Sequence, residues 1–435
     1  MKHRRIKQRQ VSKVVWGVVV FIFVFFSFFI QAKAQNYRSF RSEMKRIIEQ
    51  SLWKIGPFRV EPSLRLRDVG YDGNVYYQRE EDDPVSDYTA TLSPELRVHV
   101  LFRNYLILTL RENPEYVFYV QEKRERRWNN TFAPEFKLLL FHRFVLGGGY
   151  SYSSRRWRAT SEFDSRANEF KREFKGSFFY ETARETSIGL SVQQAEITYE
   201  DSFLRDLRSE VISLAKNLNR KETSGNIEIY YRIFSRTFLF LKGGYTEYKF
   251  LYDDARWRDS YSYQGSAGLI LPEAGRVRGK ISVGYKRLIP RRSNQKGFEG
   301  FAGNIEVVYR FWRMAFRMNL RRDSHFSYWT NNLFFIDTAG EGGLSFYLSQ
   351  RVRLDYRFLY GEGRYPEPFL SVQPEGTVEM VRRRDTYRTH TAGIVFRVIG
   401  NTGIGLQAIL WERDSNYYYE SRQRFFVGGY LTYEF

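Results

Sequence analysis

The feature that most constrains this chain is a two-residue alternation of apolar and polar side chains, which recurs from Pro57 to the C-terminus. Apolar residues such as Tyr88, Leu92 and Val98 alternate with Thr, Ser, Glu, Arg and His in one such segment. Successive side chains of a β-strand point to opposite faces, so this period predicts strands with one apolar and one polar face. A soluble sheet with one buried face would show the same alternation. The connections between the segments must therefore separate the two interpretations.

These connections alternate between short and long. The tight turns fall at Phe102–Asn104, Phe141–Arg143, Glu181–Glu185, Ile233–Arg236, Leu271–Arg276, Phe311–Arg313, Leu348–Arg351 and Val398–Thr402. The longer polar stretches are Asp68–Asp87, Gln121–Asn130, Ser153–Asn168, Tyr199–Glu222, Tyr252–Asp259, Arg287–Phe298, Arg321–Asp337, Glu362–Tyr387 and Glu412–Arg422. Short turns on one side and long loops on the other are typical of an outer-membrane barrel. We predict an all-β fold, a transmembrane antiparallel up-and-down β-barrel of about 18 strands, with about 16 as the alternative.

A barrel of this size predicts a wet interior. In hydrocarbon an open sheet would leave unpaired backbone groups at its edges, so the sheet has to close, and this strand number leaves an aqueous lumen. Aromatic residues make up 18% of the chain and would ring the outer wall near the membrane interfaces, for example at Tyr430 and Tyr433. Charged side chains on the polar faces would line the pore. The predicted pore-lining residues are Arg59, Arg65, Arg97, Lys137, Lys171, Lys175, Lys280, Arg317, Arg353 and Arg397.

The two ends of the chain indicate export. A basic segment, the apolar run Val14–Ile30 and the small residues Ala32 and Ala34 predict a cleaved signal peptide over 1–34. A retained membrane anchor is the alternative. Removing 1–34 takes away seven Lys/Arg and no acid, so the formal net charge falls from +20 to +13 (20 − 7). The last strand, 423–435, resembles the closing strand of bacterial outer-membrane barrels, and this resemblance implies that Phe435 is an assembly signal for the barrel-assembly machinery.

Residues 35–56 form a predicted periplasmic segment before the barrel of 57–435. Apolar residues recur there at roughly helical spacing, at Phe40, Met44, Ile47, Ile48, Leu52 and Trp53. This spacing allows a short amphipathic helix, and a disordered leader is the equal alternative. A helix that enters the lumen as a plug is a further option, without a specific signal in the sequence.

Composition restricts the partners. The chain has no cysteine, so it has neither a disulfide framework nor a thiolate metal site. A basic protein often binds nucleic acid, but for an exported chain we expect outer-membrane lipid, anionic lipopolysaccharide and small polar or anionic solutes as partners, and no nucleic acid. We predict no cofactor and no metal, and an oligomer is compatible with the pattern.

Two patches carry a family resemblance. The run Val69–Tyr77 resembles the first-loop signature of the putative β-barrel porin-2 family, and Ser86–Leu96 is similar to that family's second-strand pattern. The resemblance implies an outer-membrane barrel of porin type, and some members accompany exopolysaccharide export. The family supplies no established catalytic residues to transfer.

Two long loops are candidates for shaping the pore. In Asp201–Asn219, residues Leu204, Leu207, Val211 and Leu214 recur every three or four positions, which predicts a helix that constricts the mouth or caps the loops from above. In Glu362–Tyr387, the run Arg382, Arg383 and Arg384 is a candidate for binding an anionic sugar or lipid head group. A solvated charge run is the alternative interpretation.

No catalytic constellation is recognisable. The mature histidines, His99, His142, His325 and His390, have no Ser or carboxylate at a recognisable spacing. The acidic run Glu80–Asp83 indicates a hydrated loop before a cation site. We therefore expect a passive channel with a basic lumen and no enzyme. The alternatives are a barrel of an exopolysaccharide secretion or anchoring system and, third, a membrane-embedded hydrolase.

Overall fold

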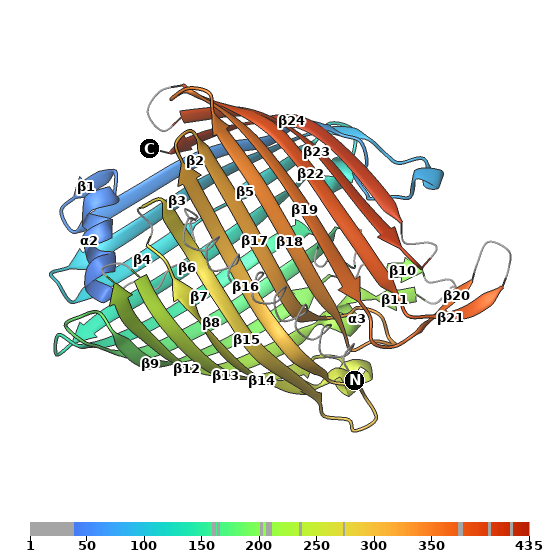
Figure 1. Ribbon diagram of the computed structural model, residues 1–435, viewed down its shortest axis with the longest axis horizontal. Helices are drawn as coiled ribbons and strands as arrows, with labels where there is room; N and C mark the ends of the chain where they lie inside the picture. Colours follow the sequence, from blue (N-terminus) through green and yellow to red (C-terminus); the bar gives the residue numbers. More distant parts are fainter. Residues whose placement is uncertain are drawn as a thin grey trace, which may run out of the picture.

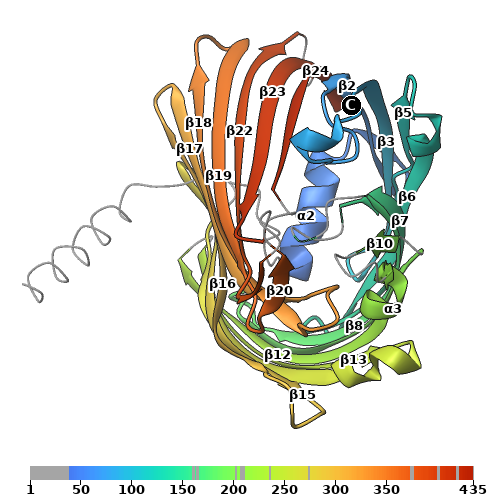
Figure 2. The same cartoon turned by 90° about the vertical axis from the view of Figure 1, so that its right-hand side faces the viewer.

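The computed structural model describes residues 39–158, 162, 166–200, 203–205, 211–234, 237–272, 275–372, 377–398, 402–417 and 421–434. Its main sheet has 20 strands and closes on itself, as Figures 1 and 2 show. The short strand β1 (Trp53–Ile55) adds to the end of β2, and β4 and β5 together occupy one wall position. The wall is therefore an 18-strand antiparallel barrel, as the sequence predicts.

The wall strands follow one another in chain order around the barrel. They are β2 (Phe58–Asp72), β3 (Asp87–Phe102), β4 (Leu106–Glu112), β5 (Glu115–Tyr119), β6 (Arg127–Leu140), β7 (Phe144–Trp157), β8 (Ala167–Glu181), β9 (Ser187–Tyr199), β12 (Arg220–Phe234), β13 (Thr237–Phe250), β14 (Ser260–Ile270), β15 (Val277–Pro290), β16 (Phe298–Phe311), β17 (Met314–Phe326), β18 (Phe334–Tyr347), β19 (Val352–Arg364), β22 (Arg384–Arg397), β23 (Thr402–Ser415) and β24 (Arg422–Glu434). The remaining elements are α2 (Phe40–Gln50), η1 (Glu80–Asp82), η2 (Lys123–Glu125), β10 (Phe203–Arg205), β11 (Val211–Ser213), α3 (Leu214–Leu218), η3 (Asp253–Arg258), β20 (Phe369–Val372) and β21 (Val378–Val381).

The barrel closes where β2 pairs with β24. Their register runs from Ser63 opposite Glu434 to Asp72 opposite Phe426, with a bulge between Leu66 and Val69. Asp68 lies in this bulge with a φ of 53°, in the left-handed region that an extra residue in one strand often adopts. The seam therefore hydrogen-bonds along most of its length and leaves no free edge.

Short turns and long loops alternate as predicted, and the strands extend further than predicted at the loop end. For example, β2 continues to Asp72 although the loop was expected from Asp68, and β19 continues to Arg364 although its loop was expected from Glu362. In β2 the bulge at Asp68 breaks the hydrophobic period, and the end of β19, Gly361–Arg364, carries no apolar side chain. The backbone ladder continues because the neighbouring strand is equally long.

The two faces of the wall differ in chemistry. Outward side chains are exposed aliphatic and aromatic residues, such as Leu190 and Val192, whereas charged residues such as Glu173 and Glu228 are buried on the inner face. The expectation that Tyr430 faces the membrane is wrong, because Tyr430 lines an inner recess. Tyr430 and Tyr433 lie three residues apart, so strand alternation cannot place both outside. In the part of the chain that the structure describes, no helix has the length and apolar character needed to span a membrane.

Candidate functional site: the arginine wall of the lumen

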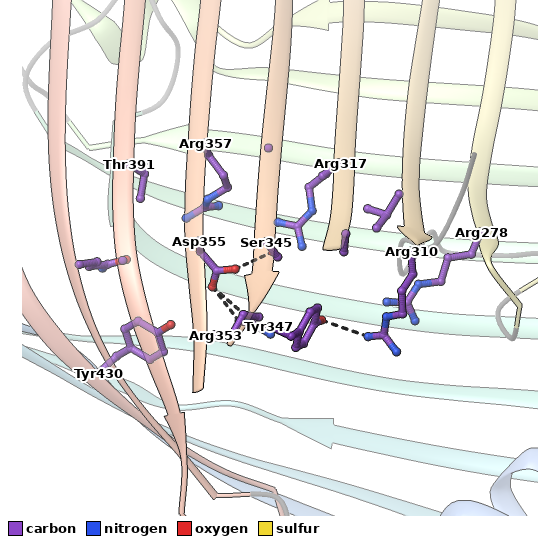
Figure 3. Close-up of a pocket in the computed structure, with 15 residues that line it drawn as sticks. Arg278, Arg310, Arg317, Ser345, Tyr347, Arg353, Asp355, Arg357, Thr391 and Tyr430 are labelled. Carbon is purple, nitrogen blue, oxygen red and sulfur yellow. Dashed lines mark hydrogen bonds and ion pairs between the residues drawn. The ribbon is translucent and has the colours of Figure 1, made fainter. Parts of the chain in front are cut away.

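The inner wall of β15–β19 and β22–β24 carries a recess of about 290 Å³ that is rich in arginine. Figure 3 shows these side chains, which project from neighbouring strands into the same space. Five guanidinium groups and one carboxylate, that of Asp355, line the recess. We call the five arginines the arginine wall: Arg278, Arg310, Arg317, Arg353 and Arg357.

Arg317 and Arg357 occupy the centre of the arginine wall. Strand register places Gly343 directly opposite Arg317 on one side and Arg357 on the other. A β-carbon added at Gly343 would lie 3.2 Å from Cγ of Arg357 and 3.4 Å from Cβ of Arg317. Because position 343 has no side chain, no group of β18 separates the two arginine side chains at this level of the wall. Among the described residues, neither has a carboxylate within ion-pair distance.

Two of the other arginines of the wall are held by neighbours. Arg353 donates from Nε to Oδ2 of Asp355 at 3.0 Å, and the Ser345 hydroxyl donates to the other oxygen at 2.6 Å. Arg310 donates to the Tyr347 hydroxyl at 3.1 Å. These contacts hold Arg353 and Arg310 in place and leave Arg317 and Arg357 available to a solute.

The structure places the remaining predicted pore-lining residues in several settings. Lys171 and Lys175 both pair with Glu173, and Arg97 pairs with Glu61 and Glu95. Arg59 donates to the carbonyls of Gly56 and Phe58, and Lys137 pairs with Glu43 of α2. Lys280 lies 5.0 Å from the ring centroid of Phe240. In the strand register, Arg65 is opposite Ser93 and Arg397 is opposite Gly403. Arg317 and Arg353 alone of the predicted set lie in the recess, and sequence reasoning missed Arg278, Arg310 and Arg357.

Helix α2 lies at the mouth on the side of the short turns. Its side chains Phe40, Met44 and Ile47 are buried against inner-wall residues at the strand ends near the short turns, namely Leu101, Ile107, Leu139, Val145 and Phe179. Figure 2 shows α2 inside the ring of strands. These wall residues belong to β3, β4 and β6–β8, so α2 packs on the wall that faces the arginine wall.

Polar contacts fix the ends of α2. The carboxylate of Glu181 accepts from the backbone N–H of Phe40 at 3.2 Å, at the positive end of the helix dipole. Glu43 pairs with Lys137, and Arg46 lies 3.7 Å from Glu61. The lumen is therefore narrowed at this end by a helix held through both apolar packing and ion pairs.

A signal for this docking exists in the sequence. The residues that receive α2 lie on polar strand faces, where they interrupt the alternation with apolar side chains close to the short turns. Leu101 follows His99 on one such face, and Val145 precedes Gly147 and Gly149 on another. Apolar residues on a wet face need a partner, and the apolar stripe of Phe40, Met44 and Ile47 supplies it.

At the opposite mouth the long loops meet in an aromatic cluster. We call six of its aromatic residues the aromatic cap: Tyr328, Trp329, Phe335, Tyr365, Phe369 and Tyr417. The same cluster includes Ala167 and Tyr199 of β8 and β9, on the far side of the barrel from β18 and β19. The aromatic cap therefore bridges opposite walls and narrows the second mouth.

The predicted helix over 201–219 is wrong where the paired strands β10 and β11 form, and these strands contain Leu204 and Val211. Among the described residues of this loop, only Leu214–Leu218 is helical. Val211 and Ile212 have a high strand propensity, so pairing with the backbone of β10 is favoured over a helical turn at these residues. Leu214 is buried in the cluster of the aromatic cap, and Leu207 lies outside the described residues.

The three consecutive arginines do not form one anion site. Arg383 is buried and pairs with Asp385, with Nη2 and Oδ2 separated by 2.7 Å. Arg384 points to the other face and pairs with Glu362, and the Arg382 carbonyl accepts from Asn416. Arg383 is buried, whereas Arg382 and Arg384 are exposed, so the three side chains do not form the joint recognition cluster that the sequence suggested.

Glu162 gives the aromatic cap a pH dependence. Its carboxylate accepts from the Tyr328 backbone N–H at 3.0 Å and from the Ser327 hydroxyl, and Arg258 and Arg383 are the nearby cations that oppose its protonation, with Asp385 and Tyr365 also close. Burial raises the pKa of Glu162 from 4.5 to about 7. Since the packed cap favours the protonated form, it is most stable below pH 4.5 and loses stability as the pH rises through about 7.

We therefore expect hydrogen exchange at the Tyr328 amide, corrected for intrinsic rates, to become faster across this pH window. Glu162→Gln keeps a neutral group in place and should flatten the dependence. A protection that stays constant with pH in the unsubstituted protein would contradict this expectation.

The remaining candidates stay apart. His99 contacts Thr109, His390 contacts Tyr356, and the ring of His325 lies tilted against that of Phe335, so these three histidines do not share a site. In the acidic run, Arg79 pairs with Asp82 and lowers its pKa. Phe435 and the predicted signal peptide lie outside the described residues.

One protein family and several solved structures match this chain. The sequence profile of the family described as putative beta-barrel porin 2 matches residues 49–323, more than half of the chain. Among solved structures, OccK2 (OpdF) of Pseudomonas aeruginosa is 10% identical with a TM-score of 0.47, over 86% of this chain and 97% of that one. OpdQ of the same organism is 9% identical with a TM-score of 0.47, over 88% and 98%.

A protein with a longer chain is also similar to this one. The FrpB iron transporter from Neisseria meningitidis is 9% identical with a TM-score of 0.44 over 85% of this chain, which spans 63% of that transporter's length. A comparison with curated protein sequences finds no match.

Proposed function

Because the chain belongs to the putative β-barrel porin 2 family, we propose that it forms a constricted outer-membrane channel for small anionic solutes and is not an enzyme. One observation carries the choice of anions: Arg317 and Arg357 flank Gly343 in the same inner-wall recess, and neither has a carboxylate partner among the described residues. Elsewhere on the wall, basic residues such as Lys171 and Arg97 are neutralised by acids.

The proposed mechanism is electrostatic focusing. A narrow, low-dielectric passage concentrates ions of the sign opposite to its walls. Helix α2 on one wall brings a passing solute close to the arginine wall on the other. Arginine forks match carboxylate and phosphate oxygens, and two adjacent forks suit a small anion with two acidic groups.

The test compares uptake into proteoliposomes of a small organic dianion and a neutral solute of similar size. We expect Arg317→Gln/Arg357→Gln to lower dianion uptake about tenfold relative to the neutral solute, the scale expected for loss of electrostatic focusing. The matched control is Arg172→Gln/Lys221→Gln, which removes two charges from the outer face of β8 and β12. Equal uptake by both variants would refute the assignment.

A second candidate has support of its own. Both mouths are narrowed, one by α2 and the other by the aromatic cap, and a barrel that does not conduct would suit an exopolysaccharide secretion or anchoring system better than a porin. A protein that stays electrically silent in bilayers, and conducts only with synthesis proteins of the polymer present, would favour this second candidate.

A further inference from the structure

The wall of the barrel forks between β16 and β17. These strands pair from Phe311 opposite Met314 only as far as Gly303 opposite Arg322. Beyond this point β16 still pairs with β15 as far as Phe298, and β17 still pairs with β18 as far as Phe326. At the loop end of the wall, residues 298–302 of β16 and 323–326 of β17 therefore do not pair with one another.

Two basic side chains bridge the fork. Nε of Arg322 donates to the Phe301 carbonyl at 3.2 Å, and its Nη1 donates to the Thr338 hydroxyl at 2.9 Å. From the inner side, Nζ of Lys286 lies 2.7 Å from Oδ1 of Asp323 and 3.3 Å from the Ser324 carbonyl. Backbone carbonyls without ladder partners thus receive side-chain donors, which a membrane-embedded wall requires.

A recess of about 460 Å³ lies at the fork. Its lining includes exposed apolar side chains of the outer face, Val283, Phe301, Leu320 and Tyr360. It also includes Ala302 and Ala339, which are buried on the inner face. Residues of both faces line the same recess, so it penetrates the wall instead of lying on its surface.

The rim of the recess is basic. Arg322 and Arg364 line it, and Arg384 joins Arg364 on the single carboxylate of Glu362. Three guanidinium groups against one carboxylate leave a net charge of +2 (3 − 1). The exposed aromatics Phe301 and Tyr360 lie within two residues of this rim, at the loop end of the wall, where aromatic belts mark the head-group level of a bilayer.

We infer that the fork between β16 and β17 binds an outer-leaflet lipid that carries phosphate beside its acyl chains, as lipopolysaccharide does. An acyl chain enters the apolar recess, and the phosphate meets Arg322 and Arg364 at head-group depth. The charge of the rim and the apolar lining below it match the two parts of such a lipid. This site lies on the outer face and is independent of the proposed passage of solutes through the lumen.

The inference is tested by the lipid that stays bound when the barrel is extracted in mild detergent and analysed by native mass spectrometry. The unsubstituted barrel should retain the phosphorylated lipid, and Arg322→Gln/Arg364→Gln should weaken retention about tenfold or more, as expected for lost hydrogen bonds to a charged group. The control Arg172→Gln/Lys221→Gln should retain it fully. Equal retention in all three proteins would overturn the inference.

A second variant tests the recess itself. Gly340→Leu adds a side chain to the outer lining of the recess, where a β-carbon would lie 3.1 Å from a terminal carbon of Leu320. We expect this variant to lose the lipid although its arginines are intact. Retention by Gly340→Leu would show binding of phosphate alone and overturn the acyl-chain part.

A measurement on the unsubstituted protein avoids any folding defect of the variants. Its thermal unfolding in micelles should shift upward with the phosphorylated lipid and not with the dephosphorylated lipid or inorganic phosphate. An equal shift with all three additives would contradict a lipid site.

Discussion

Deleting residues 40–50, which removes α2, should raise the single-channel conductance several-fold. A helix with its side chains is about 10–12 Å wide, and α2 lies inside the mouth against the wall of β3–β8. Removal of α2 therefore widens the mouth of the lumen on the side of the short turns. Planar-bilayer recordings of the deletion and the unsubstituted barrel measure the effect, and an unchanged conductance would show that α2 does not limit the current.

A charge swap provides the matched control for this deletion. Glu43→Lys places two cations together, since Glu43 pairs with Lys137, and should raise the conductance part of the way towards the deletion. Adding Lys137→Glu restores an ion pair in the opposite sense and should return the conductance to its starting value. A double variant that conducts like the single variant would argue against docking through this pair.

Replacing Arg383 with methionine should loosen the aromatic cap strongly. The guanidinium of Arg383 pairs with buried Asp385 and lies 5.0 Å from the ring centroid of Tyr365 and 5.4 Å from that of Trp329. Removing one partner of a buried ion pair costs about 3–5 kcal/mol because the other charge stays buried and unpaired. Local opening should therefore become roughly a hundredfold to several thousandfold more frequent.

Hydrogen exchange at the Tyr365 amide measures this opening, because that amide donates to the Arg383 carbonyl at 3.2 Å. Arg382→Met is the control, since Arg382 is exposed and its side chain lies on the other face. Adding Asp385→Asn to Arg383→Met removes the unpaired charge and should recover part of the protection. Protection at Tyr365 that survives Arg383→Met would contradict the role given to this ion pair.

The barrel wall was predictable from the sequence because each strand of a membrane barrel has a local alternation of apolar and polar side chains. Alternation along each strand and the short and long connections gave the strand number and the positions of the turns. The pattern failed where the period is interrupted, by the bulge near the end of β2 and by the glycines and charged residues at the end of β19. It also failed where an aromatic ring faces the lumen, as that of Tyr430 does.

The contents of the lumen were not predictable to the same degree. The two arginines at the centre of the candidate site are neighbours only through β18, where Gly343 separates Arg317 from Arg357 in register. This arrangement of the two arginines depends on strand register, and the two-residue period does not determine the register. The helical period in 201–219 was overridden by pairing of β10 with β11, a tertiary effect that spacing alone cannot show.

The zero-current potential of the unsubstituted barrel in a KCl gradient tests the central claim most directly. A passage lined by Arg317 and Arg357 should give a potential of the sign set by chloride. A potential of the sign set by potassium, or a barrel that carries no current even after removal of α2, would contradict the account.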